Sequence, residues 1–243
     1  MQNGNVAAHV VAERDIEPRT LEGDTAETRI TVDASSGSEV LEQRVVRFAP
    51  GRSQPQPLDG QNGVLYVVSG TGTLIVAGRS YELEPEMAAF VVQRSFEVEN
   101  PGPGELLVVL VTAPATNGSR ADPDNRTVRY ADREPLPAGK DREFRYLVDS
   151  DLGCHDVTQF MGLIPPGRAP MHSHVYDEVL YIVEGEGRLH IHGNVHPIGR
   201  GSCMHLPPLV EHALENTGDS PMRVLGVFHP AGDPASRAYE ANE

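Results

Sequence analysis

Nine of the ten histidines lie in the second half of this 243-residue chain. His172 and His174 are two residues apart, Glu178 follows shortly after, and His212 comes after a Pro-Pro pair. Alternate residues of a strand face the same side of a sheet, so the imidazoles of His172 and His174 can point into one cavity. Three imidazoles and one carboxylate suit a divalent first-row metal and leave positions open for water or substrate. We therefore expect a metal site formed by His172, His174, Glu178 and His212.

Other polar residues near these ligands are candidates for the same pocket. His190 and His192 share one face of a strand, which either faces solvent or lines the pocket, where histidine could serve as acid or base. His205 shares a face with Cys203, for which we expect the role of a small buried apolar residue. Tyr176 lies between the ligands, where both core packing and catalysis remain open.

The elements that position these residues occur twice. Residues 63–78, GVLYVVSGTGTLIVAG, correspond to residues 178–193, EVLYIVEGEGRLHIHG, at a spacing of 115 residues. Two copies of one unit, at roughly 40–115 and 156–231, account for most of the chain. Each has short runs rich in β-branched and aromatic residues, separated by turn glycines about every ten residues, which is typical of an antiparallel sandwich or barrel.

The first copy departs from the ligand pattern at every position. Gly63 corresponds to Glu178, Phe96 corresponds to His212, and the His-x-His segment corresponds to residues 54–57, Gln-Pro-Gln-Pro. We therefore expect the first unit to fold without this metal site, with its pocket filled by Phe96 or used for another ligand.

Two arginines of the second unit are candidates for holding a substrate carboxylate. Arg188 lies on the strand of His190, and Arg168 closely precedes the ligands. Arg52 of the unit without ligands matches Arg168, which favours a structural role for Arg168.

Two motifs in the second unit resemble those of the cupin superfamily. The pattern Gly167-x4-His172-x-His174-x3-Glu178-x6-Gly185 is similar to the first cupin motif, with one residue fewer than usual after the leading glycine. The pattern Gly201-x5-Pro207-x4-His212-x3-Asn216 is similar to the second, with leucine at 209 where glycine is usual. The resemblance implies an all-β bicupin, with two tandem jelly-roll barrels (double-stranded β-helices) and the metal in the C-terminal barrel.

From the repeat and this resemblance we predict the domain organisation. An N-terminal arm is expected at 1–38, either disordered or packed across the partner domain, and a cupin barrel without metal ligands at 39–115. A linker is expected at 116–145 and the metal-binding barrel at 146–236. The two barrels should be related by a pseudo-twofold axis.

Composition restricts the compartment and the partners. The formal net charge is −15, which disfavours binding to nucleic acid or to anionic membrane surfaces. Two cysteines cannot form a disulfide framework, and the acidic N-terminus lacks the apolar region of a secretory signal. We expect a cytoplasmic protein, with association into a homodimer as a further expectation and a small molecule as its substrate.

The leading functional hypothesis is a metal-dependent dioxygenase that acts on a small organic substrate. Iron or manganese is the favoured metal, with nickel, copper and zinc as alternatives. A second hypothesis is non-redox hydrolase, isomerase or lyase chemistry. The (S)-ureidoglycine aminohydrolase family is similar in length and duplication, but its ligands follow Glu-x-His-x3-His, whereas this chain has His-x-His-x3-Glu. A third hypothesis is a small-molecule-binding bicupin without catalysis.

Overall fold

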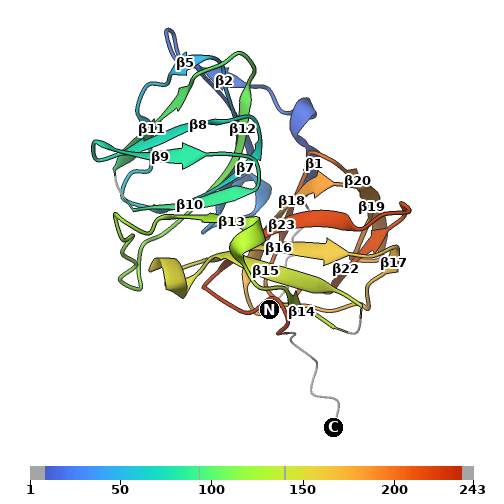
Figure 1. Ribbon diagram of the computed structural model, residues 1–243. Coiled ribbons are helices and arrows are strands. Elements are labelled where there is room, and N and C mark those ends of the chain that lie inside the picture. Colours follow the sequence, from blue (N-terminus) through green and yellow to red (C-terminus); the bar gives the residue numbers. More distant parts are fainter. Residues whose placement is uncertain (1–8, 93, 140, 237–243) are drawn as a thin grey trace.

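A computed structural model describes residues 9–92, 94–139 and 141–236 of the protein. The chain forms two β-barrels that lie side by side (Figure 1). Each barrel consists of a large and a small antiparallel sheet, as expected for tandem jelly rolls. The helices in the described segments are all short 3-10 helices, and none of these could traverse a lipid bilayer.

The first barrel contains most of the strands before residue 130. Its large sheet has the order β13 (Thr127–Arg129), β10 (Met87–Val92), β7 (Asn62–Ser69), β12 (Leu106–Ala113), β4 (Glu42–Phe48), β3 (Ala26–Val32) and β2 (Arg19–Thr20). Its small sheet has the order β5 (Gly51–Arg52), β11 (Ser95–Asn100), β8 (Gly72–Val76) and β9 (Arg79–Leu83), with β6 (Gln56–Pro57) also paired to β11.

The second barrel repeats this plan. Its large sheet has the order β1 (His9–Ala12), β21 (Ser202–Leu206), β18 (Asp177–Glu184), β23 (Met222–His229), β16 (Thr158–Ile164), β15 (Glu143–Val148) and β14 (Leu136–Pro137). Its small sheet has the order β17 (Gly167–Arg168), β22 (His212–Asn216), β19 (Glu186–Ile191) and β20 (Asn194–Gly199). The 3-10 helices are η1 (Glu13–Asp15), η2 (Ala34–Ser36), η3 (Tyr130–Asp132) and η4 (Ser150–Leu152).

The two barrels exchange edge strands. Strand β1 pairs with β21 of the second barrel although it opens the chain, and β13 pairs with β10 of the first barrel although it follows that barrel. Within the segment 1–38, the described part thus supplies β1 to one barrel and β2 and β3 to the other. The segment 116–145 likewise supplies β13, β14 and the start of β15. Half-buried residues such as Val10, Val11 and Val128 explain why these segments pair with sheets.

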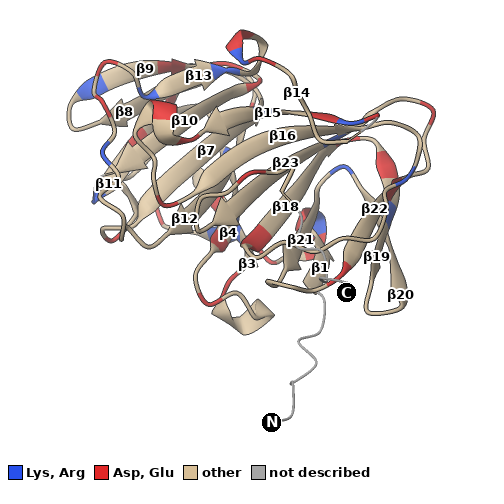
Figure 2. Ribbon diagram, turned by 90° about the horizontal axis from the view of Figure 1, so that it is seen from below, with Lys and Arg blue, Asp and Glu red and all other residues tan. Residues whose placement is uncertain are grey.

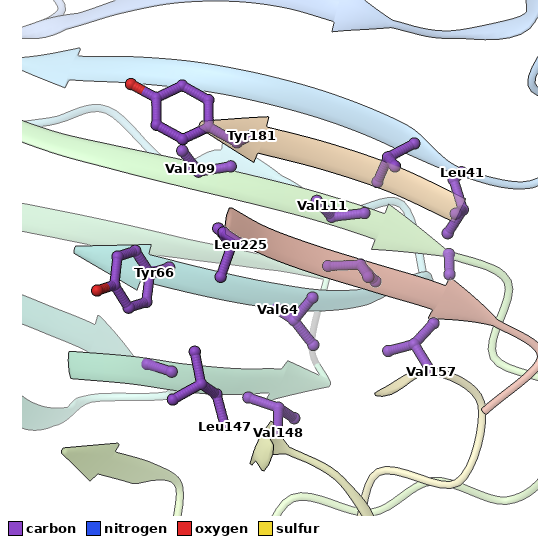
Figure 3. Packing of buried hydrophobic residues seen from close by; sticks show 14 of the residues in the cluster. Leu41, Val64, Tyr66, Val109, Val111, Leu147, Val148, Val157, Tyr181 and Leu225 are labelled. Carbon is purple, nitrogen blue, oxygen red and sulfur yellow. The ribbon is translucent and has the colours of Figure 1, made fainter. Parts of the chain in front are cut away.

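The large sheets of the two barrels face each other across a shared hydrophobic core (Figure 3). Val64 and Val109 from the first barrel meet Tyr181 and Leu225 from the second. Strands β7, β12 and β16 carry no charged residue (Figure 2), which fits strands buried between layers. Because alternate residues face opposite sides, the remaining residues of these strands fill the barrel interiors.

The interior of the first barrel is packed with apolar side chains. Phe96 is buried in this core together with Leu58. A side chain at Gly63 would meet Leu58, because a Cβ there would lie 3.0 Å from a Leu58 methyl carbon. Leu58 and Phe96 therefore occupy the space that corresponds to the ligand residues of the second barrel.

Asp156 of the second barrel forms hydrogen bonds both to the first barrel and to the segment that connects the two barrels. Its fully buried carboxylate accepts hydrogen bonds from the Asn62 side chain at 2.6 Å and the Ser119 hydroxyl at 2.5 Å. The backbone N–H groups of Thr116 and Asn117 donate to it at 2.8 and 2.7 Å. Burial acts to raise the pKa of Asp156, but these hydrogen bonds outweigh it and lower the pKa to about 2.

We expect the Asp156→Asn variant to lose about 2–3 kcal/mol of stability at pH 7, because an amide would present N–H groups to a ring of donors. The pKa of Asp156 is depressed on folding, so its contribution is present above pH 4 and is lost as the pH falls toward about 2. Urea unfolding at several pH values measures this, with exposed Asp219→Asn as control. A stability difference that does not shrink between pH 5 and about 3 would contradict the assignment.

Candidate metal centre

Three imidazoles and one carboxylate meet inside the second barrel. His212 begins β22, and its backbone pairs with that of His172 through two hydrogen bonds of 2.8 and 3.0 Å. His174 lies two residues further, where its carbonyl accepts from the Leu209 N–H at 2.7 Å. One ligand atom from each of His172, His174 and His212 lies within 4.8 Å of the others. The two-residue spacing and the sheet register thus bring the three predicted histidines together.

Each of these imidazoles is oriented by a backbone carbonyl. Nδ1 of His172 bonds to the carbonyl of Pro170 at 3.1 Å, and Nδ1 of His212 bonds to that of Val210 at 2.9 Å. Nδ1 of His174 bonds to the carbonyl of Ser236 at 2.8 Å. A carbonyl only accepts, so Nδ1 carries a proton in all three rings, and Nε2 is the nitrogen that each neutral ring would offer to a metal. This arrangement of outer hydrogen bonds is typical of histidines that bind a metal.

Glu178 lies next to this group on β18. Its Oε2 is 3.8 Å from Nε2 of His212, is buried, and has no hydrogen-bond partner among the described residues. Burial, with a smaller effect of neighbouring Asp177, raises the pKa of Glu178 to about 8. Burial, followed by the effect of His172, lowers the pKa of His212 to about 3, so its imidazole is neutral at physiological pH. An orphaned carboxylate oxygen beside the neutral His212 imidazole fits a divalent cation, which both could ligate.

The ligand group opens into a small cavity of about 100 Å³. Its other walls are mostly aromatic and aliphatic side chains from β15, β16, β22 and β23. They include Phe144, Phe160, Ile164, Leu214, Val224 and Phe228. Bulk water has little room here, so charges in the cavity interact more strongly than at the surface.

None of the four further pocket candidates is among the residues that line this cavity. His190 lies on the outer face of β19, where its Nε2 is 2.7 Å from the Glu215 carboxylate, because Leu189 and Ile191 take the inner face. His192 lies in the turn after β19, with a positive φ of 50°.

The other two candidates lie behind the cavity wall. His205 faces the partner barrel and its Nε2 is 2.6 Å from the Asp177 carboxylate. The ring of Tyr176 stacks on that of His174, with 6.2 Å between centroids. Cys203 is fully buried in the core between the barrels, as expected.

Sequence reasoning also missed two cavity residues. Arg168 and Arg188 are exposed and do not line the cavity, whereas Arg142 does. Pro234, near the end of the described chain, forms another part of the wall. Neither residue belongs to a motif, and each is distant in sequence from the histidines.

The comparisons with known proteins agree with this geometry. The family profile described as "Cupin domain" matches residues 159–228, the segment that holds all four predicted ligands. A putative glyoxylate-induced protein from Pseudomonas aeruginosa has a similar structure, with a TM-score of 0.76, 20% identity, and coverage of 96% of this chain and 91% of that chain. The second barrel therefore contains a cupin domain. With its two barrels the chain has the fold of a bicupin, and the first barrel presents no comparable His group among the residues that the structure describes.

Other cupin relatives show how far the similarity extends. The oxalate decarboxylase of Lactobacillus farciminis, solved as a formate complex, has a TM-score of 0.73 and 15% identity, over 94% of this bicupin and 88% of that chain. The uncharacterized protein MJ1618 of Methanocaldococcus jannaschii is 29% identical over 70 residues, or 28% of this chain. The match spans 56% of that curated relative's length. At these identities the structural similarities define the fold alone.

The C-terminal segment is expected to control metal affinity. A variant that ends at Asp233 loses Pro234 and the Ser236 carbonyl that orients His174. Removal of such an outer hydrogen bond costs about 10–100-fold in metal affinity. Competition with a zinc chelator measures the loss, and a variant that ends at Ala238 is the matched control. Equal zinc affinity of the two variants would show that the segment does not hold His174.

Proposed function

We propose that this bicupin is a metal-dependent dioxygenase that oxidises a small organic substrate inside its C-terminal barrel. The observation that carries the proposal is the set of three imidazoles and one buried carboxylate that faces a small apolar cavity. Such a mixed set suits iron(II) or manganese(II) and leaves adjacent positions for a substrate oxygen and for dioxygen. The cavity size favours a substrate of few heavy atoms.

The residues of the chain have separate tasks in this mechanism. A bound metal would act as a Lewis acid for a substrate hydroxyl or enol and exchange electrons with dioxygen. The carbonyls of Pro170, Val210 and Ser236 hold the imidazoles so that no reorganisation is needed when the metal binds. Glu178 gives up its proton on ligation and offsets part of the cation's charge. The aromatic walls orient the substrate and exclude water.

Oxygen consumption tests this proposal. The metal-free protein is loaded separately with iron(II), manganese(II) or zinc(II) and is mixed with a panel of small hydroxy acids, enols and catechols. We expect oxygen uptake that matches substrate loss with iron or manganese and none with zinc. Conversion that proceeds equally under argon would reject dioxygenase chemistry. Tight binding of a panel member without conversion would instead favour a non-catalytic binding protein.

A non-redox lyase is the second candidate, and two observations favour it. The fold is shared with oxalate decarboxylase, and the raised pKa of Glu178 keeps a proton on this carboxyl at neutral pH in the metal-free site. In this candidate Glu178 would protonate the carbanion left after loss of carbon dioxide rather than bind the metal. Release of carbon dioxide under argon, and its loss in Glu178→Gln, would distinguish this reaction from oxidation.

A further inference from the structure

Arg142 introduces a cation into a cavity that is otherwise apolar apart from the ligand group and Glu143. It precedes β15, and its backbone carbonyl accepts a hydrogen bond from the Ala138 N–H at 2.9 Å, which holds the backbone of Arg142 in place. Within the described ranges it is the single Lys or Arg among the lining residues. The same cavity is lined by His172, His174, Glu178 and His212, so a molecule in it lies between Arg142 and the metal site.

The guanidinium of Arg142 is poorly neutralised by the protein. Its side chain is only 12% exposed, and its Nε is buried with no hydrogen-bond partner. Its carboxylate neighbour is Asp141, at 3.6 Å, whose own side chain is 61% exposed and therefore screened by solvent. Glu143 also lines the cavity, but the structure records no ion pair between it and Arg142. A buried, weakly paired guanidinium is costly unless a ligand completes its hydrogen bonds.

We propose that Arg142 binds the carboxylate of the substrate, so that the substrate is a small organic acid with an apolar body. The planar fork of a guanidinium matches the two oxygens of a carboxylate. The other end of the molecule points toward the histidines, and Phe144, Phe160 and Phe228 contact its apolar part. This inference rests on the proposed function only in the assumption that the cavity holds a substrate. Anion binding by Arg142 can be measured without turnover.

Ligand binding by calorimetry tests the assignment. The probes are isobutyrate, its neutral analogue isobutyramide, and inorganic phosphate, each added to metal-free and to zinc-loaded protein. We expect wild type to bind isobutyrate in both forms, more tightly than isobutyramide and phosphate. Arg142→Gln should weaken isobutyrate binding at least about tenfold, the usual value of a charged hydrogen bond, and should leave isobutyramide unaffected. Arg142→Lys should recover part of the loss, because it keeps the charge without the fork.

Controls separate this role from a structural one. Arg168→Gln changes an exposed arginine outside the cavity and should bind isobutyrate like wild type. Zinc content and melting temperature of Arg142→Gln should also match wild type. Unchanged isobutyrate affinity in Arg142→Gln, no isobutyrate binding by wild type, or preference for phosphate would overturn the proposal. If Arg142→Gln loses carboxylate binding but wild type converts no acid with or without oxygen, the inference stands and the proposed function fails.

Discussion

The His212→Phe variant is expected to retain no metal after chelation and reloading at one equivalent, whereas wild type retains close to one ion per chain. His212 places its Nε2 3.8 Å from Glu178, and its loss breaks the group of three imidazoles. Oxygen uptake or any other turnover should fall with the metal. Elemental analysis after gel filtration measures the content.

The fold should survive this change. Phe96 holds the corresponding position of the first barrel, where it is buried in an apolar core. The lowered pKa of His212 means that the variant removes a neutral ring and no charge. The main cost is the hydrogen bond to the Val210 carbonyl, about 1 kcal/mol. His190→Phe on the outer face is the matched control, because it also replaces an imidazole ring by a phenyl ring. Wild-type metal content in His212→Phe would mean that the ion binds elsewhere.

Sequence alone predicts the architecture of this protein because its signals are local and repeated. Short runs of β-branched and aromatic residues, turn glycines and the duplicated segment predict two all-β barrels, and the structure confirms this class. Sequence analysis allows for an N-terminal arm that packs across the partner domain, as β1 does, but not for the pairing of β13 with β10. A sequence signal for the strands before residue 40 also exists. Asp33 and Gly37 flank η2 as Asp149 and Gly153 flank η4, so the duplication extends upstream of the predicted units.

The site residues also fall into those that the sequence predicts and those that it does not. The spacing of His172 and His174 and the motif around His212 place three ligands together without knowledge of the fold. Alternation with the apolar Leu189 and Ile191 could also have assigned His190 to the outside. In contrast, the contact of His174 with Ser236 spans 62 residues and uses a carbonyl, which no side-chain pattern reveals. Arg142 enters the cavity from a loop, where periodicity carries no information.

Replacing Glu178 with glutamine is expected to weaken metal binding at pH 8.5 more than tenfold, since even an outer hydrogen bond is worth about 10–100-fold. It should also change the pH dependence. In wild type the metal must displace a proton whose pKa is about 8, so the affinity rises about fivefold between pH 7 and 8 and levels off above. Glutamine has no proton to lose, so this rise should disappear. Isothermal titrations with zinc at several pH values measure both effects.

The stability of the metal-free protein is an independent test that the pKa of Glu178 is raised on folding. The pKa of Glu178 is raised on folding, so wild type loses stability as the pH rises from about 4.5 through about 8, where the buried carboxyl ionises. Metal-free Glu178→Gln should therefore melt at a higher temperature than metal-free wild type at pH 8.5, while zinc-loaded wild type should exceed both. Exposed Glu186→Gln should match wild type throughout. Wild-type zinc affinity and pH dependence in Glu178→Gln would remove Glu178 from the ligand set and leave it as the proton donor of the lyase candidate.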